Sequence, residues 1–150
     1  MNASCVECGE APKAERRRVC RACRNAQKRD YRNTVRGRAA VLCGEAKRRA
    51  DKAGVEFSLT REWVAERLQR GTCEVTGLPF DMSRTGHSTT GLNPNRSPSI
   101  HRFRPTGGYT PENCVLVVWA VNEMAGKYEP GTLTVIFRHA ARYYAERCNL

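Results

Sequence analysis

The sequence predicts an α+β protein: a small strand-and-helix core flanked by helices and preceded by a metal-binding element and a basic helical arm. Three observations predict it: two Cys-x-x-Cys pairs near the start, a proline-free basic stretch, and two predicted strands, one alternating and one β-branched, with a helix after the second. At 150 residues, 40% hydrophobic and 27% charged, the chain can bury one modest core, which excludes a large multidomain enzyme. Composition divides the chain into residues 1–24, residues 25–54 and residues 55–150.

The first segment carries two cysteine pairs, Cys5/Cys8 and Cys20/Cys23, separated by 11 residues. Four thiolates at this spacing suit one tetrahedral Zn²⁺ at about 2.3 Å. The stretch between the pairs is too polar to fold by apolar burial, so zinc would supply the folding energy. We expect a closed, structural zinc knuckle or ribbon. Chance pairs and a redox site are the alternatives, and a redox site would need a strand and helix around one pair.

Positive charge is concentrated in the first third of the chain. Residues 1–54 hold 15 basic and 6 acidic side chains, and the remaining residues hold 11 and 9. Such a field attracts polyanions, of which nucleic acid is the commonest inside cells, although a solvated basic surface remains an alternative. We expect no membrane partner, because the basic stretch lacks a Leu- or Phe-rich face. The start of the chain has no apolar signal segment, so we expect a cytoplasmic protein with reduced thiols.

A helical arm should carry the basic residues. Residues 22–53 contain no proline and predict one helix, or two joined near Gly37 and Gly44. A spacing of four places several basic side chains on one face, where they would contact phosphates, although an exposed charged helix is the alternative. The candidate nucleic-acid-binding residues of the arm and the turn before it are Arg17, Arg18, Arg21, Arg24, Lys28, Arg32 and Arg36.

The third segment begins with a helix and ends with one. Thr60 is a credible N-cap and Gly71 a credible end for the first helix. Residues 73–80 predict a short strand and turn, and residues 82–98 a surface loop. Strands are expected at 99–103 and 114–119, and helices at 120–127 and from 132 onward. The last helix carries an apolar stripe that we expect to pack in the core: Leu133, Ile136, Phe137, Ala140 and Tyr144.

Residues 98–122 contain a more specific pattern. It comprises Pro98-Ser99-Ile100-His101-Arg102, then Gly108-Tyr109 with Asn113, and then Trp119-Ala120-Val121-Asn122. This order resembles the HNH endonucleases of phage type, in which a ββα-metal fold surrounds one divalent cation. The resemblance covers roughly residues 73–127, and Asn113 and Asn122 are nine residues apart, as in that family.

The resemblance implies metal-dependent hydrolysis of double-stranded DNA. It implies that His101 takes a proton from water, that Asn113 orients His101, and that His101 and Asn122 meet a catalytic Mg²⁺ or another divalent cation. These roles suit phosphodiester cleavage, which needs a base that titrates near neutral pH and a cation for the developing charge. A homodimer or a phage protein partner, and action in the cytoplasm of a host cell, would accord with a phage-encoded enzyme.

The chain departs from the family at the end of the first strand, where His101-Arg102 replaces the usual Asp-His. A guanidinium cannot easily act as a base. We favour His101 as the base after a one-residue shift. Alternatively His101 ligates the cation while another group, such as His87, accepts the proton. In a third alternative Arg102 only binds phosphate, and the chain is a non-catalytic zinc-containing DNA-binding protein.

A second departure concerns the cysteines. Many members carry two further Cys-x-x-Cys pairs, and the corresponding positions here are Cys73-x-x-Thr76 and Val118-x-x-Val121. We therefore expect no second zinc site. The remaining cysteines are expected to be buried thiols, and they are Cys43, Cys73, Cys114 and Cys148.

Overall fold

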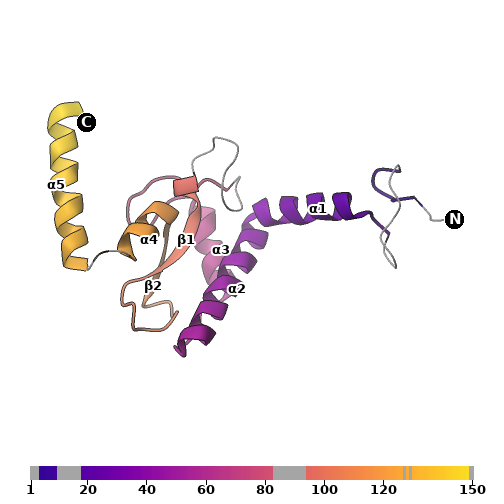
Figure 1. The fold of residues 1–150 in the computed structure, drawn as a ribbon, viewed down its shortest axis with the longest axis horizontal. Helices are drawn as coiled ribbons and strands as arrows, with labels where there is room; N and C mark the ends of the chain where they lie inside the picture. Colours follow the sequence, from indigo (N-terminus) through magenta and orange to yellow (C-terminus); the bar gives the residue numbers. More distant parts are fainter. Residues whose placement is uncertain (1–3, 10–17, 83–93, 127, 129, 149–150) are drawn as a thin grey trace.

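The computed structural model describes residues 4–9, 18–82, 94–126, 128 and 130–148 (Figure 1). The described residues form five α-helices, one 3₁₀ turn and a two-stranded antiparallel sheet, which confirms the expected mixture of helix and strand. The elements are α1 (Arg21–Asn33), α2 (Val35–Ala53), α3 (Arg61–Arg70), η1 (Pro94–Arg96), β1 (Pro98–Arg102), β2 (Cys114–Val118), α4 (Trp119–Ala125) and α5 (Pro130–Cys148). Among the described helices, none combines the length and the apolar character that crossing a membrane requires.

A kink at Thr34 separates α1 from α2, a few residues before the joint expected near Gly37. The Thr34 hydroxyl donates to the carbonyl of Tyr31 at 2.7 Å and accepts from the backbone N–H of Gly37 at 3.0 Å, so it ends one helix and caps the next. A Cβ at Gly37 would lie 1.8 Å from the Tyr31 carbonyl oxygen, so only glycine fits. Gly44 has nothing within 4 Å of a Cβ and makes no joint.

The main core lies between α2, α3 and the sheet. Small side chains on the inner face of α2, such as the fully buried Ala46, allow close packing against Val64 and Leu68 of α3. Leu116 of β2 is also fully buried in this cluster. α2 ends just before the expected boundary at residue 54. Its inner face packs in the same core as residues that come after that boundary. The expected helix from Thr60 to Gly71 is confirmed as α3, with both caps in place.

The β-hairpin has two differently covered faces. β1 and β2 pair antiparallel, with His101 opposite Val115 and Ile100 opposite Leu116. Because side chains alternate along a strand, Ile100 and Leu116 face the main core while His101 lies on the other side. A second small cluster there joins Val117 of β2 to Val121 of α4.

The segment expected as a strand and turn, residues 73–80, is mainly a tight turn. Its β pairing is a single bridge between Thr72 and Pro79. The Gly77 N–H donates to the Cys73 carbonyl at 2.9 Å, and Gly77 has a φ of 71°, which favours glycine. Cys43, Cys73 and Cys114 are buried thiols, as expected. The side chain of Cys148 and most of the expected loop at 82–98 lie outside the described residues.

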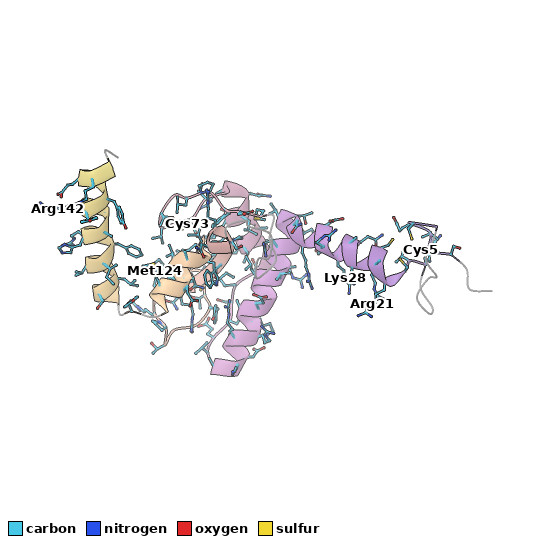
Figure 2. The ribbon with its side chains drawn as sticks, turned by 45° about the horizontal axis from the view of Figure 1, so that its top comes forward. Cys5, Arg21, Lys28, Cys73, Met124 and Arg142 are labelled. Carbon is cyan, nitrogen blue, oxygen red and sulfur yellow. The ribbon has the colours of Figure 1, made fainter. Side chains whose placement is uncertain are left out.

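The expectation that α5 packs in the core is wrong. α5 stands apart from the rest of the fold, on the side opposite α1, and its main contact is with α4 (Figures 1 and 2). Phe137 and Tyr144 are exposed, at 39% and 58%. Helical spacing shows that a helix has an apolar face, but it does not show what covers that face.

Candidate functional site

The four N-terminal cysteines form a compact sulfur cluster. Their Sγ atoms all lie within 4.8 Å of one another, and those of Cys8 and Cys20 are 4.0 Å apart. A regular tetrahedron of sulfurs with metal bonds of about 2.3 Å has edges of about 3.8 Å, so the cluster needs little adjustment. Cys5, Cys8, Cys20 and Cys23 could therefore hold a metal ion such as zinc.

The local backbone explains why these sulfurs converge. The Gly9 N–H donates to the Cys5 carbonyl at 2.9 Å, and the φ of 70° at Gly9 closes the first turn. Cys20 is the N-cap of α1, and its Sγ accepts from the Cys23 N–H at 3.4 Å. The Cys20 N–H in turn donates to the Sγ of Cys5 at 3.2 Å. The start of α1 thus brings the second pair onto the first.

Hydrogen bonds shift the pKa values of Cys5 and Cys23 in opposite directions. Backbone N–H groups, chiefly those of Cys20 and Cys8, lower the pKa of Cys5 to about 6. Hydrogen bonding of Cys23 to the sulfurs of Cys20 and Cys8 raises the pKa of Cys23 to about 12. In the absence of metal, Cys23 therefore keeps its proton at neutral pH. Metal binding must displace that proton.

The basic residues of α1 face solvent. α1 has no buried residue, and it extends from the core toward the cysteine cluster, with Arg21 and Lys28 on its outside (Figure 2). Arg18 and Arg32 are also exposed, whereas Arg24 is half-buried.

The kink at Thr34 interrupts the face on which the basic side chains were expected to lie at a spacing of four residues. Arg36 lies after Thr34, on the first turn of α2, so it does not continue the row of α1. Arg17 falls outside the described residues. Within the described ranges, no carboxylate lies within 4.0 Å of Arg21, Lys28 or Arg32, so their charges are not paired.

His101 and Asn122 meet on the outer face of the hairpin. The Nδ1 atom of His101 lies 3.1 Å from the Oδ1 atom of Asn122, which projects from α4. The Asn122 Nδ2 donates to the hydroxyl of Ser99 at 2.7 Å and, at 3.4 Å, to the carbonyl of Ile100. His101 is half-buried, and its ring also meets the edge of Phe103, with centroids 6.0 Å apart.

These contacts determine which nitrogen of His101 carries the proton. The carbonyl of Ile100 can only accept, so the Nδ2 of Asn122 must face it and the Oδ1 must face His101. Oδ1 also only accepts, and Nδ1 of His101 is therefore the donor. In the neutral imidazole the lone pair is then on Nε2. His101 can take a proton or bind a cation at that atom.

Asn113 has a different position from the one that the resemblance implies. Its Oδ1 accepts from the Arg104 N–H at 2.9 Å, and its Nδ2 donates to the carbonyls of Arg104 and Gly108, at 3.1 and 2.8 Å. A Cβ at Gly107 would lie 2.7 Å from that Nδ2. Asn113 thus closes the 104–108 loop, and in the described part of the chain the hydrogen-bond partner of His101 is Asn122.

Arg102 points to the opposite face of the hairpin from His101. Its Nη1 donates to the carbonyl of Gly107 at 2.8 Å, and its guanidinium carbon lies 4.5 Å from the centroid of the Tyr109 ring. Because successive side chains of a strand point to opposite faces, Arg102 lies on the face away from Asn122, which contacts His101. The second alternative proton acceptor, His87, lies outside the described residues.

The donors at His101 do not favour Mg²⁺. They are one imidazole nitrogen and one carboxamide oxygen, whereas Mg²⁺ prefers carboxylates and water. Among the described residues, the N-terminal cysteines form the single cluster of three or more His, Cys, Asp or Glu side chains. A borderline cation such as Zn²⁺ or Ni²⁺ accepts imidazole and suits these donors better than Mg²⁺ does.

The sequence did not predict two contacts near the candidate site. Ser99 positions Asn122, and the period of two along β1 could have indicated it, because Ser99 and His101 share a face. The stacking of Arg102 on Tyr109 depends on the loop conformation, for which the sequence has no local pattern.

Comparisons with family models, curated proteins and solved structures found no match.

Proposed function

We propose that the chain is an HNH-type endonuclease that hydrolyses phosphodiester bonds of DNA with His101 as the proton acceptor. The observation that carries the proposal is the 3.1 Å contact between His101 Nδ1 and Asn122 Oδ1, which leaves the Nε2 lone pair unprotonated in the neutral ring. Phosphodiester hydrolysis needs a base that accepts a proton from the attacking water, and an imidazole held with its Nε2 lone pair free meets that need.

Each neighbouring residue has a supporting role. Asn122 positions His101, and Ser99 positions Asn122, so the imidazole does not have to be ordered when the substrate binds. A divalent cation held by His101 or Asn122 together with substrate oxygens would supply charge stabilisation at the leaving 3′-oxygen. Asn113 acts one step further away, by keeping the loop after β1 closed.

The N-terminal third would hold the duplex. Arg21, Lys28 and Arg32 of α1 form no ion pair with a described carboxylate, so they suit phosphate contacts, which position DNA without reading its sequence. A zinc-bound cysteine cluster would fix the far end of that helix, since Cys20 and Cys23 belong to its first turn. We place the action in the cytoplasm, where thiols stay reduced and available to zinc.

A non-catalytic DNA-binding protein is the second candidate. It is favoured by the donors around His101, which include no described carboxylate, and by Arg102 in the place where the family has its usual base. In that case the cysteine cluster and the basic helix would perform the whole function, and the hairpin would be a scaffold.

Conversion of supercoiled plasmid to nicked or linear DNA separates the two candidates. Wild-type protein would be assayed with Mg²⁺, Mn²⁺ or EDTA beside His101→Ala, with Arg142→Gln, an exposed change on α5, as the control. The nuclease predicts cation-dependent conversion that His101→Ala loses and Arg142→Gln keeps. Plasmid that is retarded but uncut under every cation would favour the binding protein.

A further inference from the structure

Two guanidinium groups from different elements converge on one aromatic ring. The guanidinium carbon of Arg102, on β1, lies 4.5 Å from the centroid of the Tyr109 ring, and that of Arg49, on α2, lies 5.8 Å from it. Tyr109 is buried, at 5% exposure. A rigid ring thus brings together two cations that are far apart in the sequence.

The backbone holds this ring firmly in place. The Tyr109 N–H donates to the Glu56 carbonyl at 2.8 Å, and the Tyr109 carbonyl accepts from the Ser58 N–H at 3.0 Å, so the loop pairs with the segment before α3. A Cβ at Gly108 would lie 2.7 Å from the Glu56 oxygen, which explains the glycine there. The place where the cations meet is therefore formed before any ligand binds.

Among the described residues, neither guanidinium forms an ion pair with an acidic side chain. Within the described ranges, no carboxylate lies within 4.0 Å of Arg49 or Arg102, whereas nearby Lys47 pairs with Asp51 at 3.6 Å. Arg102 uses an Nη1 donor on the Gly107 carbonyl, and a guanidinium has five N–H donors. Arg49 is exposed. Two like charges at one ring repel each other, and an anion between them would relieve that repulsion.

The charges of both arginines also influence the pKa of the neighbouring Cys114 thiol. Burial raises the pKa of Cys114 to about 11, while the charges of Arg102 and Arg49 act to lower it and the charge of Glu112 acts to raise it. Both guanidinium groups are therefore close enough to influence one buried atom.

We infer that Arg49 and Arg102 together bind one phosphodiester phosphate of duplex DNA, on the face of the hairpin opposite His101 and Asn122. Planar guanidinium forks match phosphate oxygens, and a ring stack keeps a fork oriented. This inference rests on the proposed action on DNA. Arg49 follows Arg36 by thirteen residues along α2, about 20 Å at 1.5 Å per residue, so this phosphate is distinct from those near α1.

DNA binding in EDTA, where no cleavage interferes, tests the inference. The affinity of full-length protein for a labelled duplex would be measured over a series of salt concentrations. Arg49→Gln is the main variant, because Arg49 is exposed and its loss spares the fold. Arg48→Gln is the matched control, because helical periodicity directs Arg48 away from the core. Arg102→Gln and the double variant complete the set, with melting temperatures to verify folding.

We expect Arg49→Gln to weaken binding about tenfold, as the loss of a charged contact does, and Arg48→Gln to weaken it much less. The double variant should lower the slope of log affinity against log salt by about 1, as for one phosphate. Equal affinities of Arg49→Gln and Arg48→Gln, or a slope change of about 2, would overturn the shared site. If the wild-type protein cleaves DNA but Arg49→Gln and Arg48→Gln bind with equal affinity, the phosphate site is refuted and the nuclease proposal stands. If the affinities differ as predicted but no cleavage occurs, the phosphate site stands and the nuclease proposal is refuted.

Discussion

The carboxamide oxygen of Asn122 accepts a hydrogen bond from the Nδ1 atom of His101 at 3.1 Å. The amide end of Asn122 is held by Ser99 and Ile100, and the carboxamide cannot turn its donor toward His101 without losing the hydrogen bond to the Ile100 carbonyl, which can only accept. One helix side chain thereby sets the tautomer of a strand histidine and leaves Nε2 as the acceptor.

The first prediction concerns this positioning. Asn122→Ala should lower the kcat of DNA cleavage by about 10- to 100-fold, which is typical of the loss of a group that orients a histidine, with little change in KM. Ser99→Ala should have a smaller effect, because the Ile100 carbonyl still holds Asn122. Steady-state kinetics on a defined duplex would measure both. A changed KM with an unchanged kcat would show that Asn122 serves binding and not the chemical step.

The second prediction concerns zinc and pH. Zinc requires thiolates, and the pKa of about 12 for Cys23 means that binding displaces a proton throughout the neutral range. Affinity for zinc should therefore fall by at least about tenfold for each unit that the pH is lowered. It should fall more steeply below about pH 6, where Cys5 is also protonated. Competition with a chromophoric chelator measures this, and an affinity independent of pH near neutrality would contradict it.

The third prediction tests the kink between α1 and α2. Gly37→Ala places a Cβ against the Tyr31 carbonyl oxygen, so the helices must move apart and the free energy of unfolding should decrease by about 1–3 kcal/mol. Gly44→Ala lies in open space on α2 and should increase it by about 0.5–1 kcal/mol. Denaturant unfolding of both variants gives the comparison. Similar values for the two would mean that the kink is not required.

The fourth prediction follows from the isolation of α5. A chain that ends at Gly126 lacks this helix and should unfold with nearly unchanged free energy, because the buried clusters of the described residues include none from α5. Leu116→Ala, by contrast, removes a fully buried side chain and should cost about 2–5 kcal/mol. Thermal melts followed by circular dichroism would compare the two. A large loss on truncation would show that α5 packs against the core after all.

Local patterns predicted the helices and strands well where the relevant interactions are local. Thr60 and Gly71 cap α3 as expected, and the β-branched run after Cys114 forms β2. The joint was expected near Gly37 and lies at Thr34, because a glycine suggests a break, whereas here the close approach at Gly37 is a consequence of a threonine cap three residues earlier.

The candidate site was predictable only in part. The spacing of the cysteine pairs indicated the sulfur cluster, because its geometry depends on short turns. The sequence also indicated His101 and Asn122, but the structure exchanges the expected partners, with Asn122 beside His101 and Asn113 in the loop. Which asparagine reaches the imidazole depends on how α4 packs on the hairpin, and that tertiary relationship has no local sequence pattern.

The central claim is that His101 accepts the proton, and chemical rescue tests it most directly. Single-turnover cleavage of a labelled duplex would be measured for wild-type protein and for His101→Ala, with and without added imidazole. We predict that His101→Ala loses about 10²- to 10⁴-fold in rate and that free imidazole restores part of it while DNA binding stays unchanged. Cleavage by His101→Ala at the wild-type rate, or no cleavage by the wild-type protein with any divalent cation, would contradict the claim.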